Sequence, residues 1–487
     1  MHSSTNLSQA RDLHVGIIGG GITGLTAAFY LLRAGVRVTV LEAGPQPGGL
    51  ATYYNFGSFF WDKFYHCILT SDAALLQLIG DLGLSDELHW TETKTGFYVD
   101  GKLHSMSSAI DFLRFPPLSL FQKIRLGCGI LYAARIRDSR MLEQRLASDW
   151  LIRIFGRQNY DKLWGPLLKC KLGGCREETS AAFIWTYIAR YYSTREKTSQ
   201  KEQLGYITGG YRTVFNRLIE EIRKMGGLIE TGASVQTVTK HTTGAIEVAT
   251  GAGTFYFDKV ISTIPSQPFA KVTPQLDSGY KQKLNSVKYL GVVCFALLVK
   301  RPLSPYYVLN LTDEDLPFTG VIEMSNLISL KETAGYHLVY VPKYTIPGDP
   351  LFDASEDELW QLFRSGLSKV FPDLKETDIE KRFLFRERLV QPVPVLDYSN
   401  LVPDMRTNVE GLLLANTTQL VNSNLNNNAM VKIASQAVRA VLQEREGSGS
   451  ISATFDAETV GDPLFRSSEL EKVEYVEQPD GVGERHV

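Results

Sequence analysis

Three glycines near the start of the chain have the spacing that lets a backbone approach a phosphate group. Gly19, Gly21 and Gly24 form a G-x-G-x-x-G pattern after the apolar run HVGII at residues 14–18. In this pattern the first glycine permits a tight turn, the second admits a pyrophosphate, and the third lets the next helix pack closely. The start of that helix presents unpaired N–H groups to the phosphates. The pattern therefore predicts a dinucleotide site.

A carboxylate follows where a ribose could be bound. Glu42 ends a second apolar run, VRVTVLE at residues 36–42, and it lies 18 residues after Gly24. A carboxylate there can accept hydrogen bonds from both ribose hydroxyls and repels a 2′-phosphate. Strand, helix and strand then fit within one βαβ unit. The simpler alternative is a glycine-rich turn in an unrelated α/β fold.

A second glycine pair favours FAD over NAD as the dinucleotide. Gly48 and Gly49 lie in the stretch PQPGGLAT, just beyond Glu42. A bare NAD domain does not require this pair. The loop after the second strand must pass close to a longer, flavin-bearing dinucleotide, and glycines permit such an approach.

Residues 14–66 resemble the N-terminal segment of the flavin-containing amine oxidase superfamily. That group includes protoporphyrinogen oxidases, phytoene desaturases and, more distantly, UDP-galactopyranose mutases. The resemblance rests on the glycine turn, the terminal Glu, the GG pair before Leu, and the loop GSFFWDKFYHCI, which carries Gly57, Asp62 and His66. Larger residues stand between Asp62 and His66 than the family usually has, which implies a reshaped site beside the flavin.

Two later stretches resemble the other parts of the family's FAD domain. Residues 205–238 read as a turn, a helix and a strand. Residues 409–442 read as a buried strand, an Asn-rich loop and a helix that Asn427 or Asn428 can cap. The resemblance implies that FAD is the cofactor and that it is contacted by Gly19, Gly20, Gly21, Ile22, Thr23, Gly24, Glu42, Ala43, Gly48, Gly49, Leu50, Ala51, Val235, Asn416, Asn427, Asn428 and Ala429.

These patterns predict an α/β fold, α+β overall. A Rossmann-type FAD-binding domain is built from three segments, and a substrate domain contains helices and an antiparallel sheet. The expected ranges are 1–105 for FAD-binding segment 1, 106–204 for a helical substrate or cap region, 205–270 for segment 2, 271–400 for the substrate domain with its sheet, 401–443 for segment 3 and 444–487 for a disordered tail.

Four residues are candidates for catalysis. His66 is the first, since its motif position in the family lies near the flavin ring, although it could simply hydrogen-bond within its loop. Glu323 and Asn326 lie in VIEMSN, where an acid in an apolar strand is costly unless paired. Glu323 either faces the pocket as a proton acceptor or faces solvent. Tyr344 is expected to border the cavity. No set of metal ligands is predicted.

The stretch LSLFQKIRLGCGILYAARIRDSR, residues 118–140, has an apolar helical face with basic residues nearby. One interpretation places Leu120, Ile124 and Leu131 in a core, with the basic side chains reaching out to water. The other is a surface helix that meets lipid.

Composition limits the remaining choices. The 487 residues are 44% hydrophobic and carry a net charge of −2, so nothing indicates nucleic acid as a partner. Five scattered cysteines without a CxxC motif indicate free thiols in a reducing compartment. The polar first residues lack a signal-peptide core, and no apolar run reaches the roughly 20 residues of a spanning helix. We expect a cytoplasmic protein, either free or peripheral to a membrane.

Three functions fit these observations. The first is an FAD-dependent oxidoreductase that oxidises a C–N or C–C bond of a small-molecule substrate by hydride transfer. The second is a flavin-dependent nucleotide-sugar mutase without net redox change. The third is a flavin-binding protein without catalysis, which the large substrate domain argues against.

Overall fold

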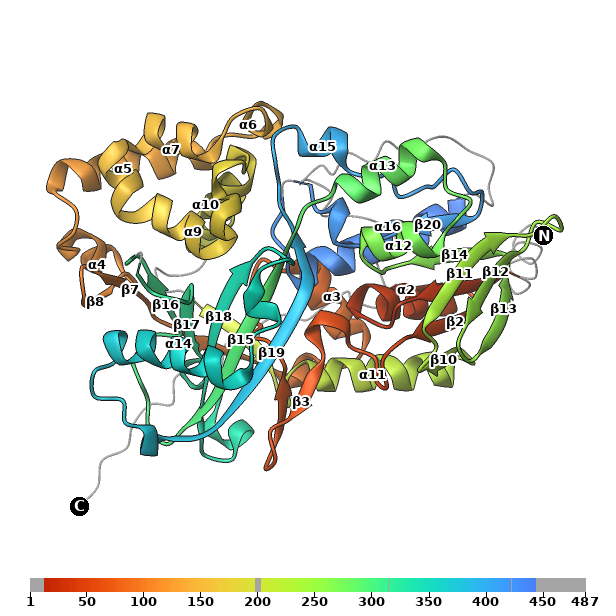
Figure 1. The fold of residues 1–487 in the computed structure, drawn as a ribbon, viewed down its shortest axis with the longest axis horizontal. Helices are drawn as coiled ribbons and strands as arrows, with labels where there is room; N and C mark the ends of the chain where they lie inside the picture. The colour runs from red at the N-terminus through yellow and green to blue at the C-terminus, as the bar shows by residue number, and fades with distance from the viewer. Residues whose placement is uncertain (1–12, 198–202, 314, 422, 444–487) are drawn as a thin grey trace, which may run out of the picture. The chain divides into compact units, whose positions relative to one another are not determined.

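A five-stranded parallel sheet brings together distant parts of the chain (Figure 1). The computed structural model describes residues 13–197, 203–313, 315–421 and 423–443, and the predicted tail at 444–487 lies outside them. All neighbouring strands are parallel, in the order β10-β2-β1-β14-β20. The strands are β1 (His14–Ile18), β2 (Arg37–Glu42), β10 (Leu228–Thr231), β14 (Lys259–Ser262) and β20 (Leu412–Leu414). The sheet thus draws on all three predicted segments.

Side chains along β1 alternate between two apolar layers, as the period of a strand requires. Val15 and Ile17 pack with the helices on one face, whereas Ile18 packs with strands on the other. The helical layer contains α2 (Ile22–Arg33), α3 (Ala73–Asp81), α11 (Tyr211–Lys224) and α16 (Asn427–Gln443). The opposite layer contains β11 (Val235–Lys240), β12 (Ile246–Thr250), β13 (Gly253–Phe257), α12 (Ser266–Val272) and α13 (Ser278–Ser286).

A second, seven-stranded sheet has the order β19-β15-β18-β17-β16-β7-β8. It is antiparallel as predicted, except that β16 and β7 are parallel. Its strands are β7 (Thr95–Val99), β8 (Lys102–Ser105), β15 (Tyr289–Val299), β16 (Val308–Leu311), β17 (Gly320–Glu323), β18 (His337–Thr345) and β19 (Ile379–Pro392).

Every residue of β15 is buried, because both faces of this sheet are covered. Phe295 and its same-face neighbours pack against α14 (Glu356–Val370). Cys294 and its same-face neighbours pack against Phe56, Trp61 and Phe64. The loop that carries the Gly57, Asp62 and His66 motif therefore lies against the inner face of this sheet.

Residues 109–197 are mostly helical, as predicted, and supply most of a third core, to which Phe97, Val99, Leu290 and Val393 also contribute. The helices are α4 (Ala109–Arg114), α5 (Leu120–Ala134), α6 (Arg140–Glu143), α7 (Ala147–Phe155), α8 (Arg157–Asn159), α9 (Gly165–Leu172) and α10 (Ala181–Lys197). The remaining elements are β3 (Tyr53–Asn55), β4 (Phe60–Asp62), β5 (Ile68–Leu69), β6 (Leu88–Glu92), β9 (Gln203–Ile207) and α15 (Tyr398–Leu401). No helix within the described ranges has both the length and the apolar character needed to cross a bilayer.

The packing of three elements differs from the expected domain ranges. Strands β7 and β8 fall within the predicted first FAD-binding segment, yet they belong to the seven-stranded sheet. Helix α13 falls within the predicted substrate domain, yet Tyr280 and Leu284 pack in the core beside β1 and β2. Periodicity in a sequence locates an element but does not identify its partner.

The expectation that Leu120, Ile124 and Leu131 pack in a core is wrong. These side chains are 68%, 58% and 43% exposed. The buried residues of α5 include Lys123 and Leu126, on the opposite side of the helix. An apolar stripe shows that a helix is two-sided, but it does not show which side meets the rest of the protein.

Candidate functional site

The glycine turn joins β1 to α2 and fixes the carboxylate of Glu42. The N–H of Gly20 donates to Oε2 of Glu42 at 2.7 Å, and the N–H of Gly44 donates to Oε1 at 2.7 Å. A Cβ on Gly24 would lie 2.0 Å from the carbonyl oxygen of Gly19, so no larger residue fits there. Helix α2 has no side-chain cap on Gly21, which leaves its first N–H groups, at Ile22 and Thr23, for a ligand.

The second glycine pair lies directly beside this turn. The N–H of Gly48 donates to the carbonyl of Gly20 at 2.9 Å, and Gly48 pairs with Gly21 in an isolated parallel bridge. Gly49 has φ +55°, and its Cβ would stand 3.1 Å from Cα of Gly21. Leu50 and Ala51 continue a 3-10 turn that packs into the neighbouring cores. The two glycine stretches form one cradle with little side-chain bulk.

The strand that begins at Val235 reaches the same place. The N–H of Ala233 donates to the carbonyl of Glu42 at 2.9 Å, and the N–H of Gly232 donates to the carbonyl of Gly44 at 3.0 Å. Val235 is half-buried and packs in the core that contains Leu41. Ala43 is exposed between these contacts. Glu42, Ala43 and Val235, all predicted to contact FAD, therefore lie close together.

The Asn-rich loop caps α16 differently from the prediction. Oδ1 of Asn426 accepts the N–H of Ala429 at 2.9 Å, so Asn426 caps the helix rather than Asn427 or Asn428. Asn427 is the first helical residue, and Oδ1 of Asn428 accepts the N–H of Leu75 at 3.1 Å. Asn416 is buried, and its Nδ2 donates to the carbonyl of Ile264 at 2.7 Å. Asn426, Asn427 and Asn428 follow one another, and any of them could cap the helix, so the sequence alone did not identify the capping residue.

These residues fit the flavin dinucleotide that the sequence predicts. The glycine cradle admits a pyrophosphate, and the uncapped start of α2 supplies N–H donors. Asn424 is 4% exposed, and neither atom of its amide hydrogen-bonds to any described residue. A buried amide without partners is costly unless a ligand satisfies it. Asn424 is therefore a candidate cofactor contact that sequence reasoning missed.

The motif histidine pairs with the motif aspartate. Nδ1 of His66 lies 3.5 Å from Oδ2 of Asp62. Asp62 is buried and accepts the N–H of Tyr211 at 2.9 Å, and its carbonyl accepts the hydroxyl of Tyr340. Burial raises the pKa of Asp62, while His66 and the Tyr211 N–H oppose that shift. This loop is thus tied both to the start of α11 and to the seven-stranded sheet.

Tyr344 lies next to this loop through a neighbour of His66. The hydroxyl groups of Tyr65 and Tyr344 are 2.7 Å apart. Burial raises the pKa of Tyr344 to about 12 and raises that of Tyr65 well above its usual range. Both phenols therefore stay protonated at neutral pH and can donate hydrogen bonds. Tyr65 was visible in the sequence only as a departure from the family pattern.

Lys171 is a further polar residue that sequence reasoning missed. It lies near the end of α9, and burial lowers the pKa of its ammonium group. The thiols of Cys170 and Cys67 lie in its electrostatic environment. Lys171 forms neither a hydrogen bond nor an ion pair with any residue that the structure describes. An unpaired amine close to the residue after His66 is a candidate for contact with substrate.

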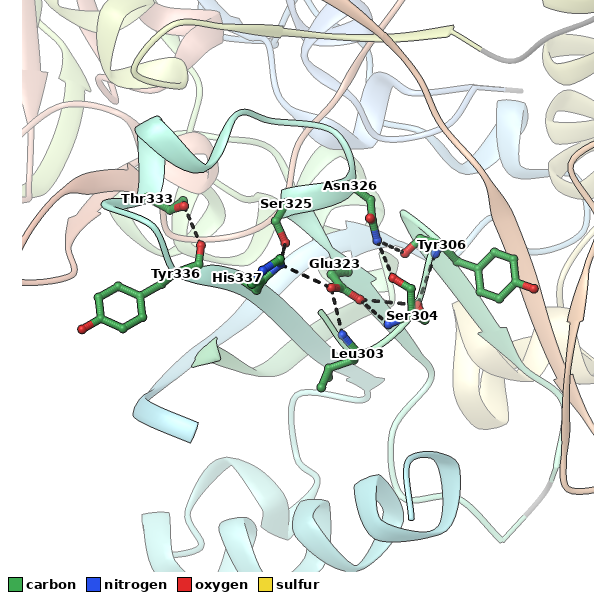
Figure 2. A network of polar contacts seen from close by, with 9 residues as sticks. All are labelled: Leu303, Ser304, Tyr306, Glu323, Ser325, Asn326, Thr333, Tyr336 and His337. Carbon is green, nitrogen blue, oxygen red and sulfur yellow. Dashed lines mark hydrogen bonds and ion pairs between the residues drawn. The ribbon is translucent and has the colours of Figure 1, made fainter. Parts of the chain in front are cut away.

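Glu323 and Asn326 belong to a separate polar network (Figure 2). The N–H groups of Leu303 and Ser304 donate to the Glu323 carboxylate at 3.0 and 2.9 Å. Nδ2 of Asn326 donates to the carbonyls of Ser304 and Tyr306 at 3.0 and 2.9 Å. The expected exposure of Glu323 to solvent is wrong, because its side chain is 1% exposed. Both residues hold the connection between β15 and β16.

The environment of Glu323 also raises the pKa of its carboxyl group. Burial raises the pKa of Glu323 to about 7, although the two backbone donors oppose the shift. Nδ1 of His337 lies 3.8 Å from its Oε1, and burial lowers the pKa of that imidazole. No contact with His66 or Tyr344 is found for Glu323 or Asn326 among the described residues. The structure thus joins Tyr344 to Tyr65, the neighbour of His66, and places Glu323 and Asn326 in a separate network.

Comparisons with known proteins add independent information. The family model for flavin containing amine oxidoreductase matches residues 22–418. The chloroplastic/chromoplastic 15-cis-phytoene desaturase of an Oncidium hybrid cultivar is 23% identical over 441 residues, covering 84% of this chain and 74% of the relative.

Two solved structures share the fold. A candidate protoporphyrinogen oxidase of Exiguobacterium sp. 255-15 has a TM-score of 0.70 at 19% identity, over 89% of this chain and 99% of its own. Reduced UDP-galactopyranose mutase has a TM-score of 0.67 at 15% identity, over 89% of this chain and 94% of its own. At these identities the likeness concerns the fold alone.

Proposed function

The chain belongs to the flavin-containing amine oxidoreductase family and is an FAD-dependent enzyme, and from this premise we propose that it oxidises a C–N or C–C bond of a small organic substrate. FAD, when bound, supplies the acceptor for a hydride from that bond. The protein's own task is to bind and orient both partners and to keep water out.

One observation carries this proposal: the two glycine stretches of the first segment and the backbone at Ala233 of the second segment meet around Glu42. Gly20 and Gly44 donate to its carboxylate, Ala233 donates to its carbonyl, and Gly48 bonds to the same turn. We propose that this cradle holds the pyrophosphate and the ribose of FAD. Asn416, Asn424 and the start of α16 would hold the flavin end.

We propose that substrate reacts beside His66 and Tyr344. The Asp62 carboxylate orients the imidazole of His66, and Tyr65 orients the phenol of Tyr344. Both phenols are held protonated by burial, so Tyr344 can donate to a substrate heteroatom without losing its proton. Glu323 and Asn326 act as positioning residues in this proposal, since their polar atoms already hold the 303–306 backbone.

A nucleotide-sugar mutase is the second candidate, supported by the shared fold with UDP-galactopyranose mutase. A diphosphate substrate would need arginines inside the pocket. Arg153 is exposed, and exposed Arg157 pairs with Asp161 at the surface. Arg176 donates to the carbonyl of Gly165 at 3.4 Å. This placement favours the oxidoreductase.

Anaerobic titration of the purified, FAD-loaded protein separates the two candidates. Amines, porphyrinogens and UDP-galactose are added in turn while the flavin absorbance is recorded. Bleaching by an amine or a porphyrinogen supports oxidation. Turnover of UDP-galactose only after reduction with dithionite would instead establish the mutase. If the protein retains FAD but none of these compounds bleaches the flavin absorbance, oxidation of these substrates is refuted.

We also propose that the enzyme works in the cytoplasm. All five cysteines have free thiols, including the exposed Cys128. Exposed thiols are typical of a reducing compartment. Fractionation of the native host would test this proposal, and recovery of the protein with secreted material would contradict it.

A further inference from the structure

Helices α4 and α5 expose a set of large apolar side chains. Among the described residues nineteen large hydrophobic side chains are exposed, and eight of them lie between residues 110 and 141. Phe121 is 73% exposed, more than any other of the nineteen. The seven that form the α4–α5 face are Ile110, Leu113, Leu120, Phe121, Ile124, Leu131 and Tyr132. A concentration of this kind marks an interaction site rather than ordinary surface.

The exposed residues of α5 follow the helical repeat. Leu120, Ile124 and Leu131 lie along one side at four- and seven-residue intervals, and Phe121 and Tyr132 adjoin them. Lys123, Leu126, Gly129 and Ala133 are buried on the other side. The helix therefore has two faces that are both largely apolar, and only one of them is covered by the described protein.

The end of α4 is held against α5. Nζ of Lys123 donates to the carbonyl of Leu113 at 2.6 Å, which ties α5 to the end of α4. Each helix begins with a complete capping box, at Ser108 and at Ser119. The face is therefore already formed without a partner, and no folding step is needed before it can dock.

The charge around this face is mostly positive. Between residues 109 and 141 the cations are Arg114, Lys123, Arg125, Arg135, Arg137 and Arg140, of which Lys123 is buried, and the acids are Asp111 and Asp138, of which Asp138 pairs with Arg140. The Asp111 carboxylate already accepts bonds from Ser105, Ser107 and Ser108. The whole chain, by contrast, has a net charge of −2. Basic residues around an apolar face complement a surface that has anionic groups on the outside and apolar groups beneath them.

We propose that the α4–α5 face docks on the surface of an anionic lipid bilayer. Phe121, Ile124 and their neighbours would enter the boundary between headgroups and acyl chains. Arg114, Arg135 and Arg137 would contact lipid phosphates. A second copy of the chain would bring the same basic residues against themselves, so charge complementarity favours lipid over self-association.

Vesicle sedimentation of the full-length, FAD-loaded protein tests this proposal. One set of vesicles is phosphatidylcholine alone, and the other contains about 30% phosphatidylglycerol. We expect the protein to sediment with the anionic vesicles and to be released by high salt. Phe121→Asp should lower the partition coefficient at least about tenfold, because an apolar anchor is lost. Leu362→Asp, at a 42% exposed position on α14, is the matched control and should bind as wild type does.

A charge series gives a second, independent readout. Arg114→Gln and Arg137→Gln should each weaken binding to anionic vesicles about fivefold. Exposed Lys271→Gln, far from the face in sequence, should not. The flavin absorbance of every variant shows whether it is folded.

Three results would overturn the proposal. The first is a folded wild-type protein that stays in the supernatant with both kinds of vesicle. The second is an equal loss of binding in Leu362→Asp and Phe121→Asp. The third is a wild-type protein that is a dimer in light scattering, together with a Phe121→Asp variant that is a monomer but sediments with vesicles as wild type does. The α4–α5 face would then be a contact between two copies of the chain.

Discussion

Replacing Glu323 by glutamine should remove a pH-dependent loss of stability. Burial raises the pKa of this carboxyl from 4.5 to about 7 in the folded protein. Between these values the unfolded chain has lost its proton while the native protein keeps it. The native state then binds more protons, so the free energy of unfolding falls as the pH rises. The stabilisation is complete below pH 4.5 and is lost by the time the pH exceeds about 7.

The size of this effect follows from the pKa interval. At about 1.4 kcal/mol per pH unit, the interval from 4.5 to about 7 corresponds to about 3 kcal/mol. Glu323→Gln cannot titrate, so the free-energy difference between wild type and variant should change by about this amount across the window. His337 contributes a trend of the opposite sign, because burial lowers its pKa. Because His337 lies 3.8 Å from the Glu323 carboxylate, the two proteins are compared in a His337→Gln background, which removes that contribution.

Urea unfolding followed by tryptophan fluorescence measures the difference at about pH 4.5 and about pH 8. Glu230→Gln, at an exposed position on β10, is the control and should give the same difference from wild type at both values. If wild type and Glu323→Gln differ by the same free energy at both pH values, the buried carboxyl is not titrating as its environment requires. The reasoning from burial would then be refuted.

Four other substitutions test the site. Gly24→Ala should lower the FAD content of the purified protein at least about tenfold, because its Cβ would lie 2.0 Å from the carbonyl oxygen of Gly19. Gly127→Ala is the control: it has open space around it and should keep its flavin absorbance. Asn426→Ala should cost about 1 kcal/mol in urea unfolding through the lost cap, and an unchanged midpoint would contradict that role. Tyr65→Phe and Tyr344→Phe should each cost about 1–2 kcal/mol, and the double variant should cost less than their sum in a thermodynamic cycle.

The sequence predicts well those parts of the molecule whose partners are close along the chain. The turn at Gly19 to Gly24 and the position of Glu42 depend on one βαβ unit, and their spacing alone was sufficient. The position of Val235 followed from family resemblance, and its proximity to Glu42 is seen in the structure. In such cases local geometry determines which atoms meet.

Features that depend on distant packing could not be predicted in the same way. Lys171 and Asn424 look like ordinary polar residues until the fold encloses them. Glu323 was identified as unusual from its apolar neighbours, but its partners at 303 and 304 come from a separate loop. The outward direction of Phe121 depends on which side of α5 the other helices cover. Periodicity carries no information on that choice.

The strand order of the parallel sheet has a consequence for biosynthesis. β1 and β2 are synthesised before the other strands of their sheet, which is completed only when β20, residues 412–414, has been made. The edge of β14 therefore stays unpaired while the intervening residues are synthesised, and contacts of such high sequence separation form slowly. During that interval the nascent chain exposes an aggregation-prone edge on the ribosome, so its yield should depend on chaperones more than that of a protein with local contacts.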